Sequence, residues 1–438
     1  MDFSNSKKLY EEAKKYVPAG ASSNIRVTAE HAPFPILFRK GLGSKVWDVD
    51  GNEYIDYLLG YGALILGHRH PKIVEAIKKQ LNEGMMLGTT VELEIEVAKK
   101  VCEMAPCADM VKFCTTGTEA TMNAIRIARA YTYRDKIVKF EGHYHGHNDY
   151  VLYNVVSDSL LGGPEFAPNK IPFYAGIPKE VAESMIITTW NELSYLERIL
   201  KKNADDIAGV IMEPIMVDNG VILPEDGYLK GVRELTEKYD VPLIFDEVFT
   251  GFRVAPGGAQ QLYGVTPDLA CFGKALGGGV PIAAVAGRKD IMEMVVPGKI
   301  GFAGTYNAHP LSLAASLATL KKLSANDGAA IRNMNSLGMK LTDDLQQILD
   351  STGHDAVVQS VGAMFTVFFT ELEKINRYRQ WTECNLDKFK EFRDALMEKG
   401  VYLHPDGMER TLLSAVHTRE DIEKTLAAAE DVLKRLPK

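Results

Sequence analysis

The feature that most constrains the fold of this chain is a regular alternation of short apolar runs and amphipathic stretches through its middle. The apolar runs predict strands at 111–114, 136–140, 185–189, 208–212, 242–246 and 269–273. Helical patterns lie between them, including 118–131 and 226–239. Near-continuously apolar strands that alternate with helices are typical of a mostly parallel sheet covered by helices. The middle of the chain therefore predicts an α/β domain.

The two ends of the chain follow a different pattern. Residues 1–60 predict a helix and then short strands, with a hairpin turn at Asp50-Gly51. Beyond about residue 330 the pattern is helix, strand at 365–369, helix, strand and helix. The stretch 155–180 contains several Gly and Pro residues and is too long for an ordinary connection. Such a stretch is typical of a lid beside a site or of a surface insertion.

Composition argues against several classes of protein. The net charge is −8, and no large basic block occurs, so nucleic acid is not expected as a partner. No apolar run reaches the ~18 residues of a membrane span, and residues 1–8 lack the apolar core of a signal peptide. The five cysteines form no CxxC pair, which indicates reduced thiols in a cytoplasmic protein.

Lys274 and Asp246 are the two side chains that point most directly to a chemistry. Lys274 lies in a Gly-rich loop after an apolar run, and its amine can form a Schiff base with an aldehyde. Asp246 ends another apolar run and can keep a pyridinium nitrogen protonated. Pyridoxal 5'-phosphate (PLP) needs both groups, although each alone is also an ordinary loop or strand-end residue. Because both are present, a scaffold without catalysis is disfavoured.

A phosphate cradle is predicted where a short apolar strand meets the helix that follows it. Thr116, Gly117 and Thr118 open this helix, so hydroxyls, free N–H groups and the positive end of the helix dipole converge there. Thr116 and Glu119 also fit a plain capping box, which is compatible with the same role.

An aromatic face for the cofactor ring is predicted in Phe140–His147. Tyr144 or His145 would stack on the ring. The three histidines at alternate positions could also suggest a metal site. A carboxylate in a ligand-like arrangement is missing, so we predict no metal ion.

With these motifs in place, the chain resembles the class III (fold-type I) PLP-dependent aminotransferases. It is most similar to the branch of glutamate-1-semialdehyde 2,1-aminomutase and its aminotransferase relatives. The matching motifs run in family order through Asp48–Tyr57, Leu66–Pro71, Thr116–Arg126, Phe140–His147, Glu213–Pro214, Phe245–Arg253, Gly273–Gly279, Gly304–Thr305 and Gly362–Phe369.

The resemblance implies a fold with two domains. It implies a large PLP-binding domain over 61–325, built on a mostly parallel, seven-stranded type of sheet. It also implies a small α+β domain built from both termini, 1–60 and 326–438.

The resemblance also implies roles for the cofactor-binding residues. Lys274 is the covalent link and the proton carrier, and Asp246 pairs with the pyridine nitrogen. Val248 packs on the ring face opposite Tyr144. The remaining implied cofactor residues are Thr116, Gly117 and Thr118 at the phosphate and Glu213, which positions the site.

Two further roles follow from the resemblance alone. Thr305 resembles the threonine that reaches the phosphate of a neighbouring subunit, which implies a homodimer with shared active sites. Arg26 aligns with an arginine that grips a substrate carboxylate through two hydrogen bonds, although an exposed arginine is commonly only solvated.

The chain departs from the aminomutase pattern at positions that handle substrate. Residues 154–163 replace a mobile Gly-Ser-Gly loop, Tyr61 replaces a tryptophan, and Asp218, with Asn219 beside it, replaces an asparagine. The segment 304–310 differs as well. These changes favour an aminotransferase that moves an amino group between an amino acid, β- and D-amino acids included, and a keto acid. The alternatives are the aminomutase and an amino-acid racemase or epimerase.

Overall fold

The computed structural model describes residues 1–28, 34–156, 161–405 and 407–438, which form two compact units. The large unit comprises Pro71–Arg332 and Ile375–Thr382. The small unit comprises Met1–His70, Asn333–Lys374 and Glu383–Lys438.

The unit boundaries differ from those expected at 60/61 and 325/326. The long helix α9 (Pro310–Thr352) breaks at Ala325–Gly328, where Asn326, Asp327 and Gly328 have positive φ. The helix then resumes, and the division between the units falls about one turn after this break. The segment Ile375–Thr382, which includes α10 (Tyr378–Thr382), belongs to the large unit although it lies near the C-terminus in sequence.

A seven-stranded sheet forms the centre of the large unit. Its strand order is β4-β10-β9-β8-β7-β5-β6. The five strands from β9 to β6 run parallel, whereas β10 is antiparallel to both β4 and β9. The predicted strands are confirmed as β4 Met110–Cys114, β5 Lys136–Phe140, β6 Met185–Thr188, β7 Ile207–Met212, β8 Leu243–Glu247 and β9 Leu269–Phe272. No strand was predicted at β10 (Ala283–Gly287), because its run of Ala and Gly has little strand character.

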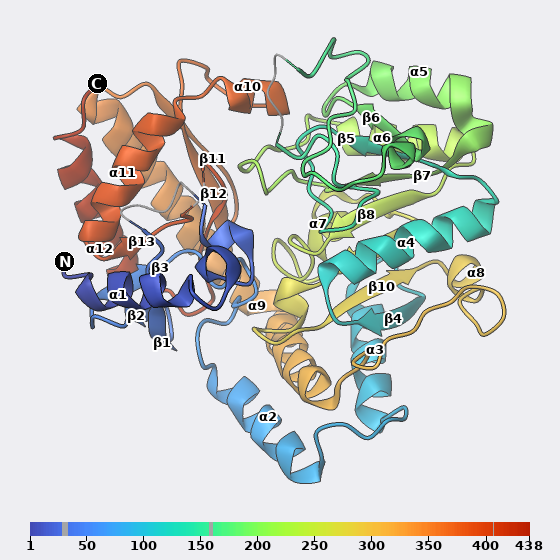
Figure 1. Ribbon diagram of the computed structural model, residues 1–438, viewed down its shortest axis with the longest axis horizontal. Helices are drawn as coiled ribbons and strands as arrows, with labels where there is room; N and C mark the ends of the chain where they lie inside the picture. The colour runs from blue at the N-terminus through green and yellow to red at the C-terminus, as the bar shows by residue number, and fades with distance from the viewer. Residues whose placement is uncertain (29–33, 157–160, 406) are drawn as a thin grey trace. The chain divides into compact units, whose positions relative to one another are not determined.

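Helices cover this sheet. Gly117–Thr132 forms α4, which crosses the sheet and contacts β7, β9 and β10 (Figure 1). Its buried positions include Ala120, Ala124, Ile127 and Ala128, and these small or apolar side chains let the helix pack closely. Besides α10 and the first part of α9, the large unit also contains α2 Pro71–Glu83, α3 Glu92–Met104, α5 Leu193–Asn203, α6 Tyr228–Lys238, α7 Gly258–Tyr263 and α8 Lys289–Met292.

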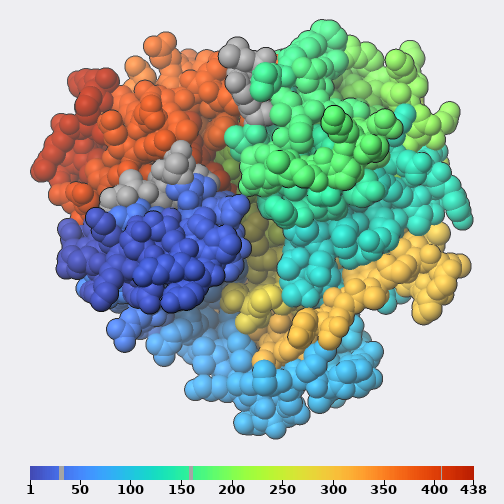
Figure 2. Space-filling model, in the orientation of Figure 1, coloured from blue at the N-terminus to red at the C-terminus, as the bar shows by residue number. Residues whose placement is uncertain are grey.

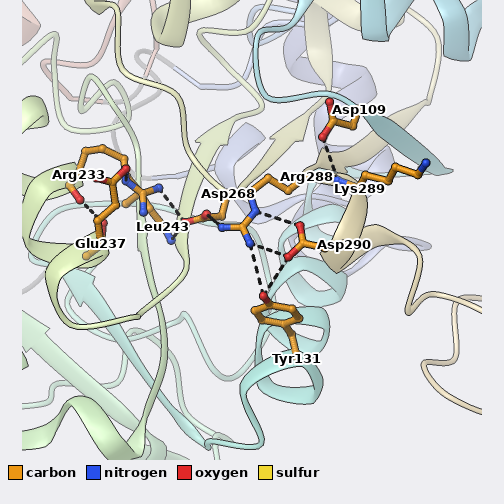
Figure 3. Close-up of polar contacts among 10 residues, drawn as sticks. Asp109, Tyr131, Arg233, Glu237, Leu243, Asp268, Arg288, Lys289 and Asp290 are labelled. Atoms are coloured by element: carbon orange, nitrogen blue, oxygen red, sulfur yellow. Dashed lines mark hydrogen bonds and ion pairs between the residues drawn. The ribbon is translucent and has the colours of Figure 1, made fainter.

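A buried carboxylate, Asp268, joins several of these elements just before β9. It accepts hydrogen bonds from Arg233 of α6 (2.7 Å), from Arg288 after β10 (2.6 Å) and from the backbone N–H of Leu243 (2.8 Å). Figure 3 shows that Arg288 also reaches Asp290 and Tyr131, so the network extends to α4. The network therefore fixes strand ends at the edge of the sheet where β8 and β9 begin.

The small unit carries two sheets. The first has the order β1-β2-β3-β13, and its β2–β3 hairpin turns at Asp50-Gly51 as predicted, with Gly51 at φ 95°. The second has the order β11-β12-β14, with a fully buried β12. The helices and strands of the small unit include α1 Ser4–Ala13, β1 Phe38–Leu42, β2 Lys45–Asp48, β3 Glu53–Asp56, β11 Ala356–Val361, β12 Met364–Phe369, α11 Leu386–Glu398, β13 Val401–Tyr402, β14 Thr411–Leu412 and α12 Arg419–Leu433. Within the described ranges, no helix combines the length and the apolar character that crossing a membrane requires.

Candidate active site

The candidate site lies where the parallel strands β8 and β9 end. In their register Asp246 faces Cys271 and Glu247 faces Phe272. Lys274 follows two residues after Phe272, at the start of the 3-10 turn Lys274–Leu276. The carboxyl ends of parallel strands are where α/β sheets bind ligands, so the fold itself brings lysine and aspartate to one edge.

Lys274 occupies an unusual backbone conformation. Its φ is 42°, in the left-handed region that non-glycine residues rarely adopt. Its side chain is half-buried, and Nζ lies 4.4 Å from the centroid of the Phe249 ring. Positive φ in a non-glycine residue is concentrated at functional sites, so the loop geometry supports a functional role for this residue.

Asp246 and Glu247 are adjacent in sequence but point to opposite faces of the sheet, as successive strand residues do. Glu247 is fully buried and accepts from Thr250 Oγ1 (2.8 Å), Ala259 N (2.6 Å) and both nitrogens of Gln260. Burial raises the pKa of Glu247. Its oxygens are therefore committed to the start of α7, and Asp246 is the acid available at the site.

Asp246 is paired with a histidine from the aromatic segment. Its Oδ2 lies 2.8 Å from His145 Nδ1, and its Oδ1 accepts the N–H of Val248 at 3.0 Å. His145 is buried, and burial lowers its pKa although Asp246 opposes the shift. In the tautomer that carries its proton on Nδ1, a neutral His145 donates to Asp246. The structure gives the His145 ring a hydrogen bond to Asp246, and stacking of Tyr144 or His145 on the cofactor ring stays a prediction.

The three histidines of the aromatic segment point to separate partners. His143 Nδ1 accepts the N–H of Glu213 (2.9 Å), and His147 packs its ring 5.7 Å from that of Tyr174. Their different contacts show that they serve as hydrogen-bonding and packing residues.

The aromatic segment is fixed on the N-terminus of α4. The carbonyl oxygen of His145 accepts from Thr121 Oγ1 (2.6 Å), and the N–H of His147 donates to Thr118 Oγ1 (2.9 Å). A Cβ on Gly146 would lie 2.7 Å from Thr118 Cα, so only glycine allows this approach. Tyr144 itself is held through its backbone, since its N–H donates to Glu213 Oε1 at 2.9 Å.

The predicted phosphate cradle has the expected form. Thr116 and Glu119 make a complete capping box, in which Thr116 Oγ1 accepts from Glu119 N and Glu119 Oε2 accepts from Thr116 N. The N–H groups of Gly117 and Thr118 belong to the first turn, where a helix provides them no acceptor. Such a terminus suits an anion, and the binding of a phosphate by Gly117 and Thr118 stays a prediction.

Val248 joins the cradle to the lysine loop. A Cβ on Gly117 would lie 2.9 Å from Val248 Cγ1, and a Cβ on Gly273 would lie 3.1 Å from the same atom. The structure therefore brings Gly117, Val248 and the residue before Lys274 into contact, as a shared cofactor site requires.

The segment after β7 contains Glu213, Asp218 and Asn219, and it contacts the backbone of the aromatic segment through Glu213 and Asn219. Glu213 is buried, and burial, Asp218 and Asp246 together raise its pKa well above the usual range. Asn219 donates its amide to the carbonyl oxygens of Gly142 (2.6 Å) and Val155 (2.9 Å). Its amide is thus engaged with backbone, and contact of Asn219 or Asp218 with a substrate stays a prediction.

Thr305 belongs to the large unit but lines a cavity separate from Gly117, Asp246 and Lys274. It is exposed and lines a cavity of about 450 Å³ with residues that include 86–90, Lys112 and 302–304. The lining includes none of Gly117, Asp246 or Lys274. Its predicted contact with a neighbouring subunit's phosphate stays a prediction.

Arg26 and Tyr61 belong to the small unit. Arg26 is exposed on the 3-10 turn Asn24–Arg26, and Tyr61 donates its hydroxyl to the carbonyl oxygen of Ile25 at 3.4 Å. Their roles toward a substrate stay predictions. The loop 154–163 lies partly outside the described residues, at 157–160.

Two charged residues near the site were not predicted. Lys139 interrupts the apolar run Ile137–Phe140, and that interruption is the only sequence signal for it. Arg379 makes a two-point ion pair with buried Glu141, at 3.1 and 3.2 Å. No local pattern identifies Arg379, because more than two hundred residues separate the partners.

The residues present fit PLP. The cradle offers hydroxyls and N–H groups to a phosphate, Val248 and Tyr144 belong to segments that meet there, and Asp246 is a buried carboxylate fixed by His145. The buried Nε2 of His145 has no hydrogen-bond partner among the described residues. The donor set therefore suits a group with both an anionic and an aromatic part.

Comparison with known proteins defines the class. The sequence model of the family Aminotransferase class-III matches residues 27–433, and the chain belongs to this family. Fold-type I PLP-dependent transferases share its fold, and PLP is its cofactor.

Individual relatives refine this placement. The chain is 44% identical over its full length to a glutamate-1-semialdehyde 2,1-aminomutase of Persephonella marina, and all of that protein is covered. Among solved structures it is similar to an omega-transaminase from Sphaerobacter thermophilus, with TM-score 0.91 and 32% identity over 98% of this chain and 97% of the other. It is also similar to a glutamate-1-semialdehyde aminomutase from Pseudomonas aeruginosa in complex with PMP, with TM-score 0.88 and 26% identity over 99% and 95%.

Proposed function

We propose that this protein is a glutamate-1-semialdehyde 2,1-aminomutase, which moves an amino group within one carbon skeleton and yields 5-aminolevulinate. The single observation that carries the proposal is the end-to-end identity of 44% with a protein of that name. It reverses the preference for intermolecular transfer drawn from the sequence. That preference rested on a few substrate-handling positions, whereas the similarity extends over the whole chain.

In this proposal each residue of the site has a separate role. When bound, PLP supplies an aldehyde for the Lys274 amine and a ring that withdraws electrons from the substrate carbon. The Lys274 amine takes and returns the substrate proton. Asp246 presents a negative charge to a protonated ring nitrogen, and His145 holds that carboxylate by a 2.8 Å hydrogen bond. Gly117 and Thr118 donate N–H groups to the phosphate.

An aminotransferase remains the second candidate because of a specific observation. Tyr61 and the segment 154–163 differ from the aminomutase pattern, and these differences affect substrate handling rather than PLP binding. A transaminase releases its keto product, so it needs no loop that retains an intermediate.

Isotope labelling separates the two candidates. A mutase exchanges nitrogen only among molecules of its own substrate and product, so a nitrogen-15 labelled amino donor should pass no label to pyruvate or 2-oxoglutarate. Glutamate-1-semialdehyde should meanwhile be converted to 5-aminolevulinate. Label transfer to a free keto acid without 5-aminolevulinate formation would overturn the mutase proposal and establish the transaminase.

The same proposal includes a homodimer with active sites completed by both chains. Exposed apolar side chains gather on α2 and the segment after it: Leu81, Met85, Met86 and Leu87. Figure 2 shows this light-blue segment at the surface. Met86 and Leu87 also line the cavity that contains Thr305, so the apolar surface and the predicted phosphate-binding threonine coincide. Small amino and keto acids are the proposed substrates, with neither nucleic acid nor membrane as partner, in the cytoplasm.

A further inference from the structure

Lys139 is a fully buried lysine in the centre of the large unit. It lies on β5, between the apolar residues Val138 and Phe140, and 0% of it is exposed. An ammonium group buried in this way is costly unless it is paired or hydrogen-bonded. A methionine or leucine would fill the same space without that cost, so the amine calls for a specific reason.

The amine of Lys139 joins two separate stretches of backbone. Nζ donates to the carbonyl oxygen of His143 at 3.0 Å and to the carbonyl oxygen of Tyr153. These carbonyls lie on the two arms of the loop that leaves β5 and returns along residues 151–155. The N–H of Gly142 donates to the carbonyl oxygen of Asn154 at 2.8 Å, so the arms are paired next to the lysine.

The bond to His143 fixes the peptide unit that precedes Tyr144. Glu213 holds His143 and Tyr144 through two further hydrogen bonds, since it accepts the Tyr144 N–H and donates its own N–H to His143 Nδ1. His145 follows, with its ring bound to Asp246. Lys139 is therefore two peptide units away from the group that fixes the ring-binding carboxylate, without touching the site itself.

Charge adds to this geometry. Burial lowers the pKa of Lys139 to about 7, although Glu213 and Glu141 oppose the shift. The lysine in turn helps to lower the pKa of His145 and that of His143. A cation at this place favours the neutral form of His145.

We propose that Lys139 is a positioning residue for the amino-group chemistry: by holding the His143 carbonyl oxygen, it sets the orientation of Tyr144 and His145 toward the cofactor. The inference rests on the proposed PLP site. It holds for a mutase and for a transaminase alike, because both need the same ring orientation.

The test compares Lys139→Met, which keeps the stem and removes the amine, with Lys136→Met on the same strand. Lys136 is partly exposed and pairs with Asp206 at the surface, so its variant is the matched control. Both variants are loaded with PLP, and the circular dichroism induced in the visible band of the bound cofactor is recorded without substrate. We expect Lys139→Met to retain PLP with a reduced or inverted signal, and Lys136→Met to match wild type.

Turnover provides a second readout. Misplacing groups at a reaction centre by about 1 Å can cost roughly 10²-fold in rate, so kcat of Lys139→Met should fall by about tenfold or more, with KM changed by less than about threefold. Lys139→Gln, which retains an N–H donor, should recover part of both signals, and it replaces the Met variant if that variant does not fold.

Two results would overturn the proposal. One is a cofactor signal and a kcat for the Met variant equal to those of Lys136→Met. The other is an equal loss of signal in both Lys139 variants that parallels a general loss of far-ultraviolet dichroism. Because the cofactor signal is read without substrate, failure of wild type to convert glutamate-1-semialdehyde would end the mutase proposal and leave this one standing.

Discussion

At the scale of single residues, the hydrogen-bond partners of a side chain decide whether it supports the fold or is available for the chemistry of the site. Asp246 and Glu247 illustrate this division, since Glu247 is surrounded by donors from Thr250, Ala259 and Gln260, whereas Asp246 is hydrogen-bonded to His145 and to the N–H of Val248. The same type of side chain is structural at one position and chemical at the next, because strand geometry turns successive residues to opposite faces.

Replacing Lys274 with alanine should leave PLP bound through its phosphate but abolish turnover. Nucleophile and proton carrier are lost together, so we expect kcat to fall on the order of 10³-fold or more. Steady-state turnover and the visible absorbance of the bound cofactor measure this. The exposed Lys230 serves as control, and substantial turnover by Lys274→Ala would remove Lys274 from its proposed role.

Asp246→Asn and Glu247→Gln should behave in opposite ways. The first removes the charge that faces the ring nitrogen, so single-turnover rates should drop about 10²-fold or more while the Tm changes little. The second disturbs the buried contacts with α7 and should lower the Tm. Near-normal single-turnover rates in Asp246→Asn would show that another group stabilises the ring.

At the scale of elements, long-range ion pairs hold loops on the large unit. The short helix α10 is placed there by Arg379, which contacts Glu141 and the carbonyl oxygens of Gly162 and Gly163. Asp268 has a comparable role among α6, β8 and β10, as drawn in Figure 3.

Arg379→Met should destabilise the large unit by about 3 kcal/mol, because it leaves the buried carboxylate of Glu141 without its partner. The double variant with Glu141→Gln removes both charges and should recover part of this loss. Thermal unfolding of the two proteins measures the difference. Equal Tm values for wild type and Arg379→Met would refute the role of this pair.

Asp268→Asn should lower the free energy of unfolding by about 3 kcal/mol, since it removes one charge from a buried pair and turns an N–H donor toward an arginine. Asp290, at the exposed end of the same network, is the control, and Asp290→Asn should change stability by less than about 1 kcal/mol. Calorimetry of both variants decides, and equal effects would mean that burial of Asp268 contributes nothing.

At the scale of the whole molecule, the proposed dimer would place Thr305 beside a phosphate held by another chain. Thr305→Ala should then weaken PLP retention without changing the fold of either unit, whereas Thr90→Ala, in the same cavity, should not. Sedimentation velocity with detection of the cofactor's absorbance measures both properties. A fully active monomer at the assay concentration would contradict shared sites.

The sequence by itself determined the class of fold and supplied the candidate residues of the cofactor site. Strands β4 to β9 follow from apolar runs, and the Thr116–Thr118 cradle, Lys274 and Asp246 follow from local patterns beside them. These features are local, because strand character, a helix N-terminus and a strand-end acid are each written in a few consecutive residues.

Only the tertiary structure decided the rest. It paired His145 with Asp246, directed Asn219 to the backbone of Gly142 and Val155, and placed α10 on the large unit through Arg379. It also added β10 as an antiparallel strand and gave a buried lysine, Lys139, two backbone carbonyls to hold. Most of these depend on contacts between residues far apart in the chain, and even the two Lys139 bonds, which span 4 and 14 residues, require the loop after β5 to fold back on its strand.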